Sequence, residues 1–269
     1  MARYDEFDRS VWAARRRVPA TVGGPRGEVS SADVVEVYGP LAELVAERAR
    51  GTEPFVVAVT GSVAVGKSAA AAALASAVAT DTARTPVSVV CTDGFLYPNR
   101  VLAERGLLER KGFPESFDLD ALVRFVTTVR DRAPEARAPV YSHSTYDIVD
   151  GAAQVVERPS VLILEGLPFP EEHVDFTVYV DAATDDIEHW YVQRFCRLCA
   201  DATSDESSFF RLFRDYSTEQ ATAFARQVWA SINLVNLEEH ILPTRDTSDV
   251  ILEKGPDHAV RRVRVRIGE

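Results

Sequence analysis

The chain has 269 residues, 46% of them hydrophobic and 26% charged, with a formal net charge of −11. That length holds one large α/β domain or two small ones, and the acidity argues against a broad nucleic-acid-binding or membrane-binding surface, which needs an excess of lysine and arginine. No apolar run approaches the roughly 20 residues that span a bilayer. The N-terminus, MARYDEFDRSVWAARRRV, lacks the apolar stretch of a secretory signal, and three cysteines cannot build a disulfide framework, so we expect a cytoplasmic protein.

Helices and strands are predicted to alternate along most of the chain. Residues 1–50 should form a helical extension, because SSADVVEVYGPLAELVAERAR combines a serine N-cap with apolar residues at helical spacing. Further helices are predicted at residues 67–79, 120–132, 185–200 and 217–242. Strands are predicted at residues 55–60, 86–93, 159–166, 174–182, 248–255 and 261–268.

This alternation predicts an α/β fold of three layers, with a mostly parallel central sheet and helices on both faces. The first four strands are apolar throughout, as strands covered on both faces should be. No repeat and no linker rich in glycine, proline and serine divides the sequence, so we expect one domain over 1–269 with its core at 55–269. The basic run RRVRVRIGE should be an edge strand with a solvated face, and we expect no nucleic-acid and no membrane partner.

Residues 57–74, VAVTGSVAVGKSAAAAAL, contain a phosphate-binding motif. Gly61, Gly66, Lys67 and Ser68 fit G-x-x-x-x-G-K-[ST] between a predicted strand and a predicted helix, which is the context that a P-loop requires. The glycines let backbone N–H groups turn around phosphates, and the helix N-terminus adds the positive end of its dipole. The motif therefore predicts a P-loop NTP hydrolase-like fold. The predicted ATP contacts in the loop are Gly61, Ser62, Val63, Ala64, Val65, Gly66, Lys67, Ser68 and Ala69.

Two carboxylates follow predicted strands on the same side of the sheet as this loop. Asp93 in CTDGFLYPN can accept a proton from an attacking hydroxyl, or else cap the next turn. Glu165 in VLILEG can hold Mg²⁺ together with the Ser68 hydroxyl, or else bond to amides of the loop. The P-loop alone does not separate a kinase from an ATPase motor, but the sequence has no guanine-reading N-K-x-D motif of a GTP switch.

Nine segments carry the most specific signal. They are GSVAVGKS, TDGFLYPN, RKGFPESFD, PVYSHSTYDIV, LILEGL, WYVQRF, INLVNL, ILPTR and KGPDHAV. In this order they resemble the bacterial type I pantothenate kinases, of the P-loop kinase group that also holds uridine kinase and phosphoribulokinase. The likeness runs from about Tyr4 to Arg266. It implies a homodimer that phosphorylates the primary hydroxyl of pantothenate with ATP and Mg²⁺, the committed step towards coenzyme A.

The resemblance also implies a role for each matching residue. Asp93 would activate the hydroxyl, Lys67 would hold phosphate, and Arg194 would steady the transferred phosphoryl group. The residues that match pantothenate contacts are Tyr141, His143, Tyr146, Tyr191 and Asn233, beside Asp93 and Arg194, with apolar walls from Phe195, Phe210 and Ile232. Lys254 and His258 match residues that lie near the adenine of ATP in the family. Without the resemblance, Arg194 reads as a surface charge and His143 as a structural histidine.

Several positions depart from the family pattern. The loop after Glu165 is short, and Pro168 stands where the family has asparagine. Ala69 and Ala72 replace a threonine and an arginine, and because that arginine helps the family bind the phosphates of its inhibitor coenzyme A, we expect weakened inhibition. Leu198 replaces a phenylalanine of the acceptor pocket. A kinase for another hydroxyl metabolite, such as a nucleoside or sugar, therefore stays possible, as does a catalytically silent nucleotide-binding regulator.

Overall fold

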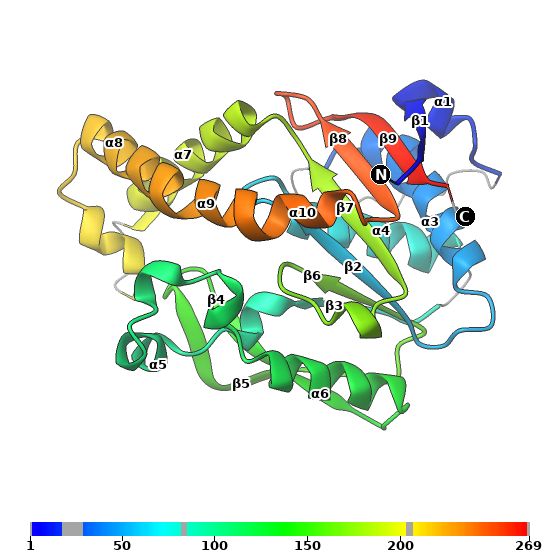
Figure 1. Cartoon of the computed structure of the whole chain (residues 1–269), viewed down its shortest axis with the longest axis horizontal. Helices are drawn as coiled ribbons and strands as arrows, with labels where there is room; N and C mark the ends of the chain where they lie inside the picture. Colours follow the sequence, from blue (N-terminus) through cyan, green and yellow to red (C-terminus); the bar gives the residue numbers. More distant parts are fainter. Residues whose placement is uncertain (1, 18–28, 82–84, 203–206, 268–269) are drawn as a thin grey trace.

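The computed structural model describes residues 2–17, 29–81, 85–202 and 207–267. Its centre is a seven-stranded sheet in the order β1-β9-β8-β7-β2-β6-β3 (Figure 1). The strands are β1 (Tyr4–Asp8), β2 (Phe55–Gly61), β3 (Val87–Cys91), β6 (Val161–Glu165), β7 (Phe176–Asp181), β8 (Val250–Lys254) and β9 (Val260–Arg266). The strands from β8 to β3 run parallel, so the loops that follow them lie along one edge of the sheet.

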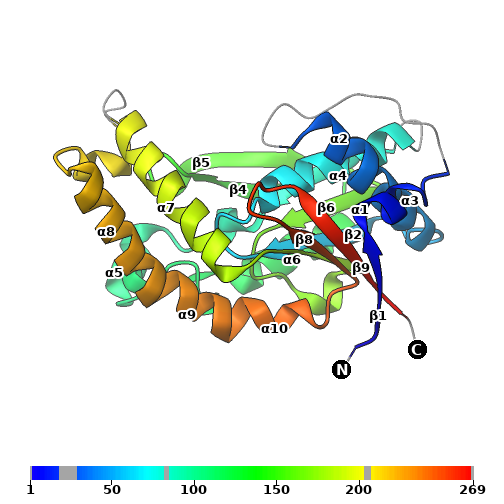
Figure 2. The same cartoon turned by 90° about the horizontal axis from the view of Figure 1, so that it is seen from above.

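Helices cover both faces of this sheet (Figure 2). On one face α4 packs against β2, α3 packs on α4, and Val57 and Val59 of β2 belong to the same buried core. On the other face α6 packs Leu122 and Phe125 against Val56. The expected three-layer α/β fold is confirmed, and the buried strands account for the continuous apolar runs in the sequence. The helices are α1 (Arg9–Ala13), α2 (Ser31–Asp33), α3 (Gly39–Arg48), α4 (Lys67–Asp81), α5 (Asn99–Glu104), α6 (Leu119–Arg130), α7 (Thr184–Asp201), α8 (Thr218–Val228), α9 (Leu234–Asn236) and α10 (Leu242–Arg245).

The N-terminal segment departs from the helical expectation, although part of that expectation, residues 18–28, lies outside the described residues. Strand β1 pairs antiparallel with β9 along its whole length. Strand β9 therefore lies inside the sheet, and our prediction of an edge strand was wrong. The guanidinium of Arg264 on β9 contacts Glu6 on β1 at 3.1 Å and Glu253 on β8 at 2.8 Å. Carboxylates on both neighbouring strands thus pair with the charge of Arg264.

An unpredicted β-hairpin lies beside the open edge of β3. Its strands are β4 (Ala136–Ser142) and β5 (Asp147–Val156). Gln154 Nε2 donates to a β3 carbonyl oxygen at 2.7 Å. Strand β4 comes so close to Gly94 that a Cβ there would lie 2.1 Å from the carbonyl oxygen of Pro139. The hairpin thus holds the turn after β3, Thr92–Phe95, and carries its own turn residues to the same place.

Helices α7 and α8 build a small core of their own, to which Phe195, Phe210 and Ala225 belong. After α8 the chain stays helical to Arg245, but π-helical turns interrupt it at Trp229–Asn233 and Leu237–Ile241. Such turns are frequent at functional sites because they change which side chains share one face. Over the described residues, none of the helices is both long and apolar enough to cross a membrane.

Candidate active site

The P-loop joins β2 to α4 and has the backbone that its glycines predict. Gly61 and Gly66 have φ angles of 138° and 92°, which only glycine adopts freely. A Cβ on Gly61 would lie 2.3 Å from the carbonyl oxygen of Val180, so the loop also needs glycine for its approach to β7. Ala64 has a φ of 62°, a left-handed conformation that is uncommon for alanine. The loop is therefore held in a conformation that local preference alone would not select.

Some side chains of the P-loop are buried in the core, and others are exposed to solvent. The ammonium of Lys67 donates to the Ser62 carbonyl oxygen at 2.9 Å, folded back across the loop. The hydroxyls of Thr60 and Ser62 are buried without a hydrogen-bond partner among the described residues. Ser68 is exposed at the start of α4, whereas Val65 is fully buried and offers only backbone to a ligand. The partly exposed members of the predicted loop contacts are Val63, Ala64, Gly66, Lys67 and Ala69.

Both predicted carboxylates lie at strand ends beside this loop. Asp93 is in the 3-10 turn directly after β3, and Glu165 ends β6, where it pairs in register with Cys91 and with Val59 on β2. Burial raises the pKa of the Cys91 thiol, and the negative charges of Asp93 and Glu165 raise it further. Glu165 is only 6% exposed. Two carboxylates thus lie around one thiol at the carboxyl edge of the sheet.

Three ring residues from the β4–β5 hairpin face this edge. The Tyr141 ring centre lies 5.2 Å from the His143 ring centre and 6.2 Å from that of Tyr146. Tyr146 in turn stacks on Phe209 at 4.9 Å, and the Phe209 N–H donates to the Ser144 carbonyl oxygen at 2.8 Å. The hairpin and the 3-10 turn Phe209–Phe213 therefore lie against each other beside the site.

His143 marks where the predicted charged residues meet. Removal from water lowers the pKa of its imidazole; Asp93 and Glu165 raise it, and Arg194 and Lys67 lower it. The net pKa lies below the ordinary 6.5, so the ring is neutral at pH 7. A neutral imidazole can accept a hydrogen bond as well as donate one.

Helix α7 supplies Tyr191 and, one turn later, Arg194. Burial raises the pKa of Tyr191, and a hydrogen bond from Asn233, in the π-helical turn after α8, partly opposes this. Ile232 is half-buried in the same turn. Phe195 and Phe210 are each 7% exposed with ring centres 5.9 Å apart, so most of their area packs the α7–α8 core and only an edge remains for an acceptor. Leu198 also packs against that core.

Sequence reasoning missed Lys111. Its ammonium donates to the Asn99 side-chain oxygen at 2.7 Å and lies 5.0 Å from the Tyr141 ring centre. Burial lowers the pKa of Lys111 to about 8, and the charges of Asp147 and Asp93 partly oppose this shift. A signal was present in the sequence, since lysine occurs only at 67, 111 and 254 among 30 basic residues. Lys111 is thus a third cation of the site: the charge of Asp93 acts on it, whereas Lys67 and Arg194 act on His143.

Lys254 and His258 lie at the end of β8 and in the turn that follows. The Lys254 ammonium donates to the Val65 carbonyl oxygen of the P-loop at 2.9 Å. The His258 ring stacks on Trp190 of α7, with centres 3.9 Å apart. The structure thus brings the β8–β9 turn to the P-loop and gives both residues protein partners.

The donor atoms fit Mg²⁺. Ser68 offers a hydroxyl and Glu165 a carboxylate, both hard oxygen ligands of the kind that Mg²⁺ prefers. Among the described residues no three His, Cys, Asp or Glu side chains gather as a metal cage. That is the donor set of an ion held mainly by nucleotide phosphates and water, with one or two protein ligands.

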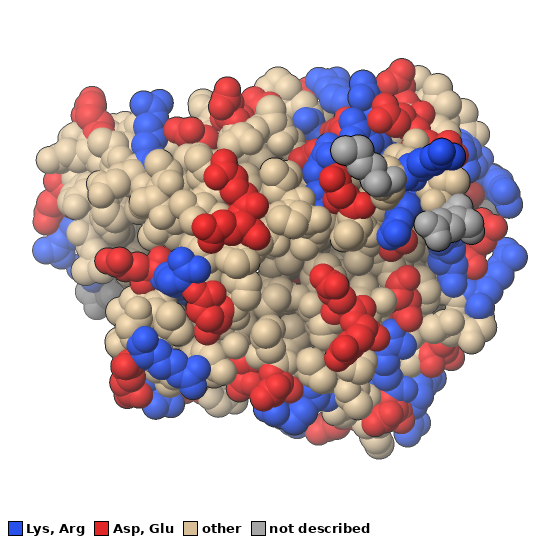
Figure 3. Space-filling view, in the orientation of Figure 1, with Lys and Arg blue, Asp and Glu red and all other residues tan. Residues whose placement is uncertain are grey.

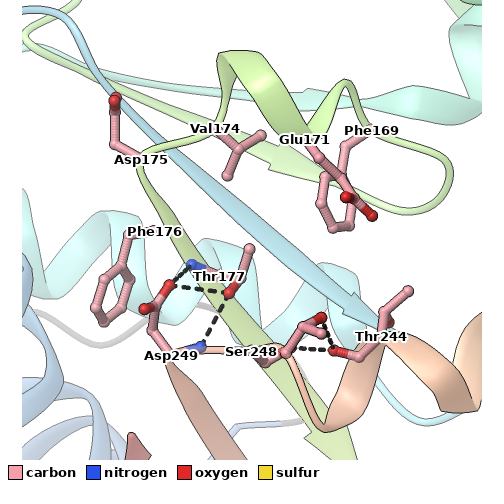
Figure 4. A pocket seen from close by; sticks show the side chains of 10 residues that line it. Phe169, Glu171, Val174, Asp175, Phe176, Thr177, Thr244, Ser248 and Asp249 are labelled. Carbon is pink, nitrogen blue, oxygen red and sulfur yellow. Dashed lines mark hydrogen bonds between the residues drawn. The ribbon is translucent and has the colours of Figure 1, made fainter. Parts of the chain in front are cut away.

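A pocket away from this site is structural in character. It lies between the loop after β6 and α10, at the amino ends of β7 and β8, opposite the P-loop edge (Figure 4). The Asp249 carboxylate accepts from both the N–H and the hydroxyl of Thr177, and the Ser248 hydroxyl donates to the Thr244 carbonyl oxygen. These polar groups satisfy one another. Acidic and basic side chains intermix on the face shown in Figure 3, so surface charge there does not mark a second site.

Comparison with known proteins places this geometry in a family. Residues 56–261 match the phosphoribulokinase/uridine kinase family. The pantothenate kinase of Mycolicibacterium smegmatis is 43% identical over 98% of this chain and 96% of its own length, and that of Sorangium cellulosum is 42% identical over 98% and 97%. The first of these alignments spans 301 positions, more than the 269 residues here, so the relative carries segments that this chain lacks.

Among solved structures, a putative fructose transport system kinase from Silicibacter sp. TM1040 matches with a TM-score of 0.60 and 26% identity, over 75% of this chain and 92% of that one. The chain therefore belongs to the phosphoribulokinase/uridine kinase family and, within it, to the pantothenate kinases.

Proposed function

We propose that the chain transfers the γ-phosphoryl group of ATP to the primary hydroxyl of pantothenate, giving 4′-phosphopantothenate, the first step of coenzyme A biosynthesis. One observation carries this: the P-loop between β2 and α4 has Asp93 and Glu165 beside it, at the ends of β3 and β6 on the same edge of the sheet. Support for the acceptor comes from relatives named pantothenate kinase, which match nearly the whole chain.

Asp93 is suited to activate the acceptor hydroxyl. In the reaction the hydroxyl oxygen forms a bond to the γ-phosphorus, the bond from that phosphorus to the β,γ-bridging oxygen breaks, and the hydroxyl proton passes to the Asp93 carboxylate. The position of Asp93 beyond the end of β3 supports this role, because ligands of parallel α/β sheets bind beyond the strand ends. A positioned base of this kind accounts for about 100- to 10,000-fold in rate.

Cations balance the charge that spreads over the transferred group. Lys67 would exchange its bond to the Ser62 carbonyl oxygen for one to phosphate. Arg194 and Lys111 approach from the acceptor side, from α7 and from the loop before α6. When bound, Mg²⁺ would neutralise phosphate charge, with Ser68 and Glu165 as its protein ligands.

The acceptor-side groups match pantothenate in kind. Its hydroxyls, amide and carboxylate need polar partners, which Tyr191, Asn233 and neutral His143 offer. Its dimethyl carbons need apolar surface, which the rings of Tyr141 and Tyr146 offer. We also propose a homodimer in the cytoplasm, on the family resemblance, with inhibition by coenzyme A weakened because Ala72 carries no charge.

ADP release from the purified protein with MgATP tests this function. Pantothenate, uridine and a panel of small alcohols would be supplied separately, with Asp93→Ala as the blank. Pantothenate-dependent release that is lost in the variant is the expected result. Release with another hydroxyl compound alone would overturn the acceptor assignment and point to the short loop after β6. Tight ATP binding without release for any acceptor would favour a silent regulator.

A further inference from the structure

The turn between β8 and β9 is shaped to direct one lysine at the P-loop. The two strands pair regularly until Glu253, which faces Arg262, but Lys254 faces Val260, so the register shifts between these two positions. Such irregularities re-aim a side chain where a strand ends. Here the re-aimed residue is Lys254, one of only three lysines in the chain.

Lys254 contacts the backbone of the P-loop. When a P-loop turns its N–H groups inward around phosphate, its carbonyl groups point outward and need donors. The Lys254 ammonium supplies one at the Val65 carbonyl oxygen, 2.9 Å away. A Cβ on Gly66 would lie 2.7 Å from the same ammonium nitrogen, the one heavy atom of the described residues within 4 Å of it when the chain neighbours of Gly66 are set aside. Position 66 therefore requires glycine for two reasons: its positive φ and the space that Lys254 occupies beside it.

The turn that carries Lys254 is itself braced. Gly255 N–H donates to the Ala259 carbonyl oxygen at 2.9 Å and closes the turn. The Trp190 indole N–H donates to the Pro256 carbonyl oxygen at 3.3 Å, and the Trp190 ring stacks on His258. Trp190 belongs to α7, next to Tyr191 and one turn before Arg194. A continuous series of contacts thus runs from the acceptor-side helix through this turn to the P-loop.

We propose that Lys254 is a positioning residue: it pins the P-loop to the end of β8 through the Val65 carbonyl, and it acts on nucleotide affinity through the loop. This rests on the proposed function only in that the P-loop binds a nucleotide. The family resemblance led us to expect Lys254 near the adenine instead. The two roles concern different parts of the nucleotide, since the P-loop binds the phosphates whereas an adenine contact binds the base.

Three probes separate these roles: ADP, tripolyphosphate and adenosine, each titrated by calorimetry with the full chain. In Lys254→Met we expect ADP and tripolyphosphate to lose affinity by the same factor, about tenfold or more, as for loss of a hydrogen bond from a charged donor. Adenosine should change less than about twofold. Arg261→Met is the matched control, because it removes a positive charge at the start of β9, directly after the turn, where the ion-pair partner of Arg261 is the exposed Asp257. It should leave all three affinities near wild type.

Hydrogen exchange of the ligand-free protein gives a second readout. Residues 62–68 should exchange faster in Lys254→Met and at the wild-type rate in Lys254→Arg, which keeps a charged donor. Unchanged exchange in Lys254→Met, or loss of adenosine binding equal to the loss of ADP binding, would overturn the proposal. An equal loss of tripolyphosphate binding in Arg261→Met would also overturn it, since general charge would then suffice. If the wild-type protein binds ADP but does not phosphorylate pantothenate, the proposed function is overturned but this inference is not.

Discussion

The ammonium nitrogen of Lys111 lies 4.1 Å from the centre of the Tyr146 ring and donates to the carbonyl oxygen of the same residue at 2.5 Å. Tyr146 has a φ of 55°, and this left-handed conformation turns both its ring and its carbonyl towards the lysine. The contact joins the loop before α6 to the hairpin over Asp93. It also withdraws the ammonium from water, which is why the pKa of Lys111 falls to about 8.

This pKa predicts an alkaline limit of activity. The charge of Lys111 is present below about pH 8 and is lost as the pH rises through that value, well before a lysine of ordinary pKa 10.5 would deprotonate. If the charge stabilises the transferred phosphoryl group, kcat/KM should fall above about pH 8. In Lys111→Arg the guanidinium stays charged, so the decrease in kcat/KM should begin at a pH higher by at least about one unit. A pH profile of kcat/KM for the wild type and the variant checks this. An identical alkaline decrease in both proteins would show that another group titrates.

Replacing Asp93 by asparagine should separate catalysis from binding. The amide keeps the size of the carboxylate but cannot take the hydroxyl proton, so kcat should fall about 100- to 10,000-fold. The Kd of ADP should stay within about threefold, because Asp93 lies beyond β3 and the loop grips phosphate from β2. Steady-state kinetics and calorimetry on one preparation test this. A kcat within a factor of about five of wild type would remove Asp93 as the base.

The parallel sheet and the P-loop could be predicted because their signals are local. Strands β2 and β6 are buried along their whole length, which leaves a continuous apolar run in the sequence, and the P-loop is contiguous. The hairpin was missed because β5 is mostly exposed and Pro139 interrupts β4. Strand β1 was missed because its partner, β9, lies at the other end of the chain.

The site residues also divide into those with a local signal in the sequence and those that depend on the tertiary fold. Asp93 and Glu165 were placed correctly at strand ends, since strand ends can be read from hydrophobic pattern. The environment of Lys111 could not be read, because Tyr146 and Asn99 come from the hairpin and from α5, and only the tertiary fold joins them. The contact of Lys254 with Val65 depends likewise on a register shift that no periodicity reveals.

An ion-pair network between α10 and the sheet predicts a stability effect without an effect on the site. Arg245 contacts Asp181 at 2.7 Å and Glu253 at 3.4 Å, and all three side chains are at most 23% exposed. Arg245→Met would leave two partly buried carboxylates without this partner, so we expect a loss of about 2 kcal/mol in unfolding free energy. Thermal unfolding should show a midpoint about 4 to 8 °C lower. Arg137→Met, whose pair with Glu135 is exposed, should change stability by less than about 0.5 kcal/mol.

A loss in Arg245→Met no larger than that in Arg137→Met would mean that desolvation cancels the network. The Kd of ADP should be unchanged in both variants. A weakened Kd in Arg245→Met would instead indicate that the network supports the nucleotide site through Glu253, the neighbour of Lys254.

The last prediction concerns coenzyme A. Ala72 is exposed on α4, one turn beyond Ser68, so a long side chain there has room to reach towards phosphates at the P-loop. Because Ala72 offers neither charge nor donor, coenzyme A should inhibit this chain more weakly than the pantothenate kinase of Mycolicibacterium smegmatis at equal ATP. Ala72→Arg should lower the inhibitory concentration by about tenfold, as expected for one charge-assisted contact to phosphate, while Ala72→Gln, of similar length but uncharged, should change it little. If Ala72→Arg and Ala72→Gln behave alike, charge at this position does not control inhibition, and the segments that this chain lacks become the better explanation for any difference from the relative.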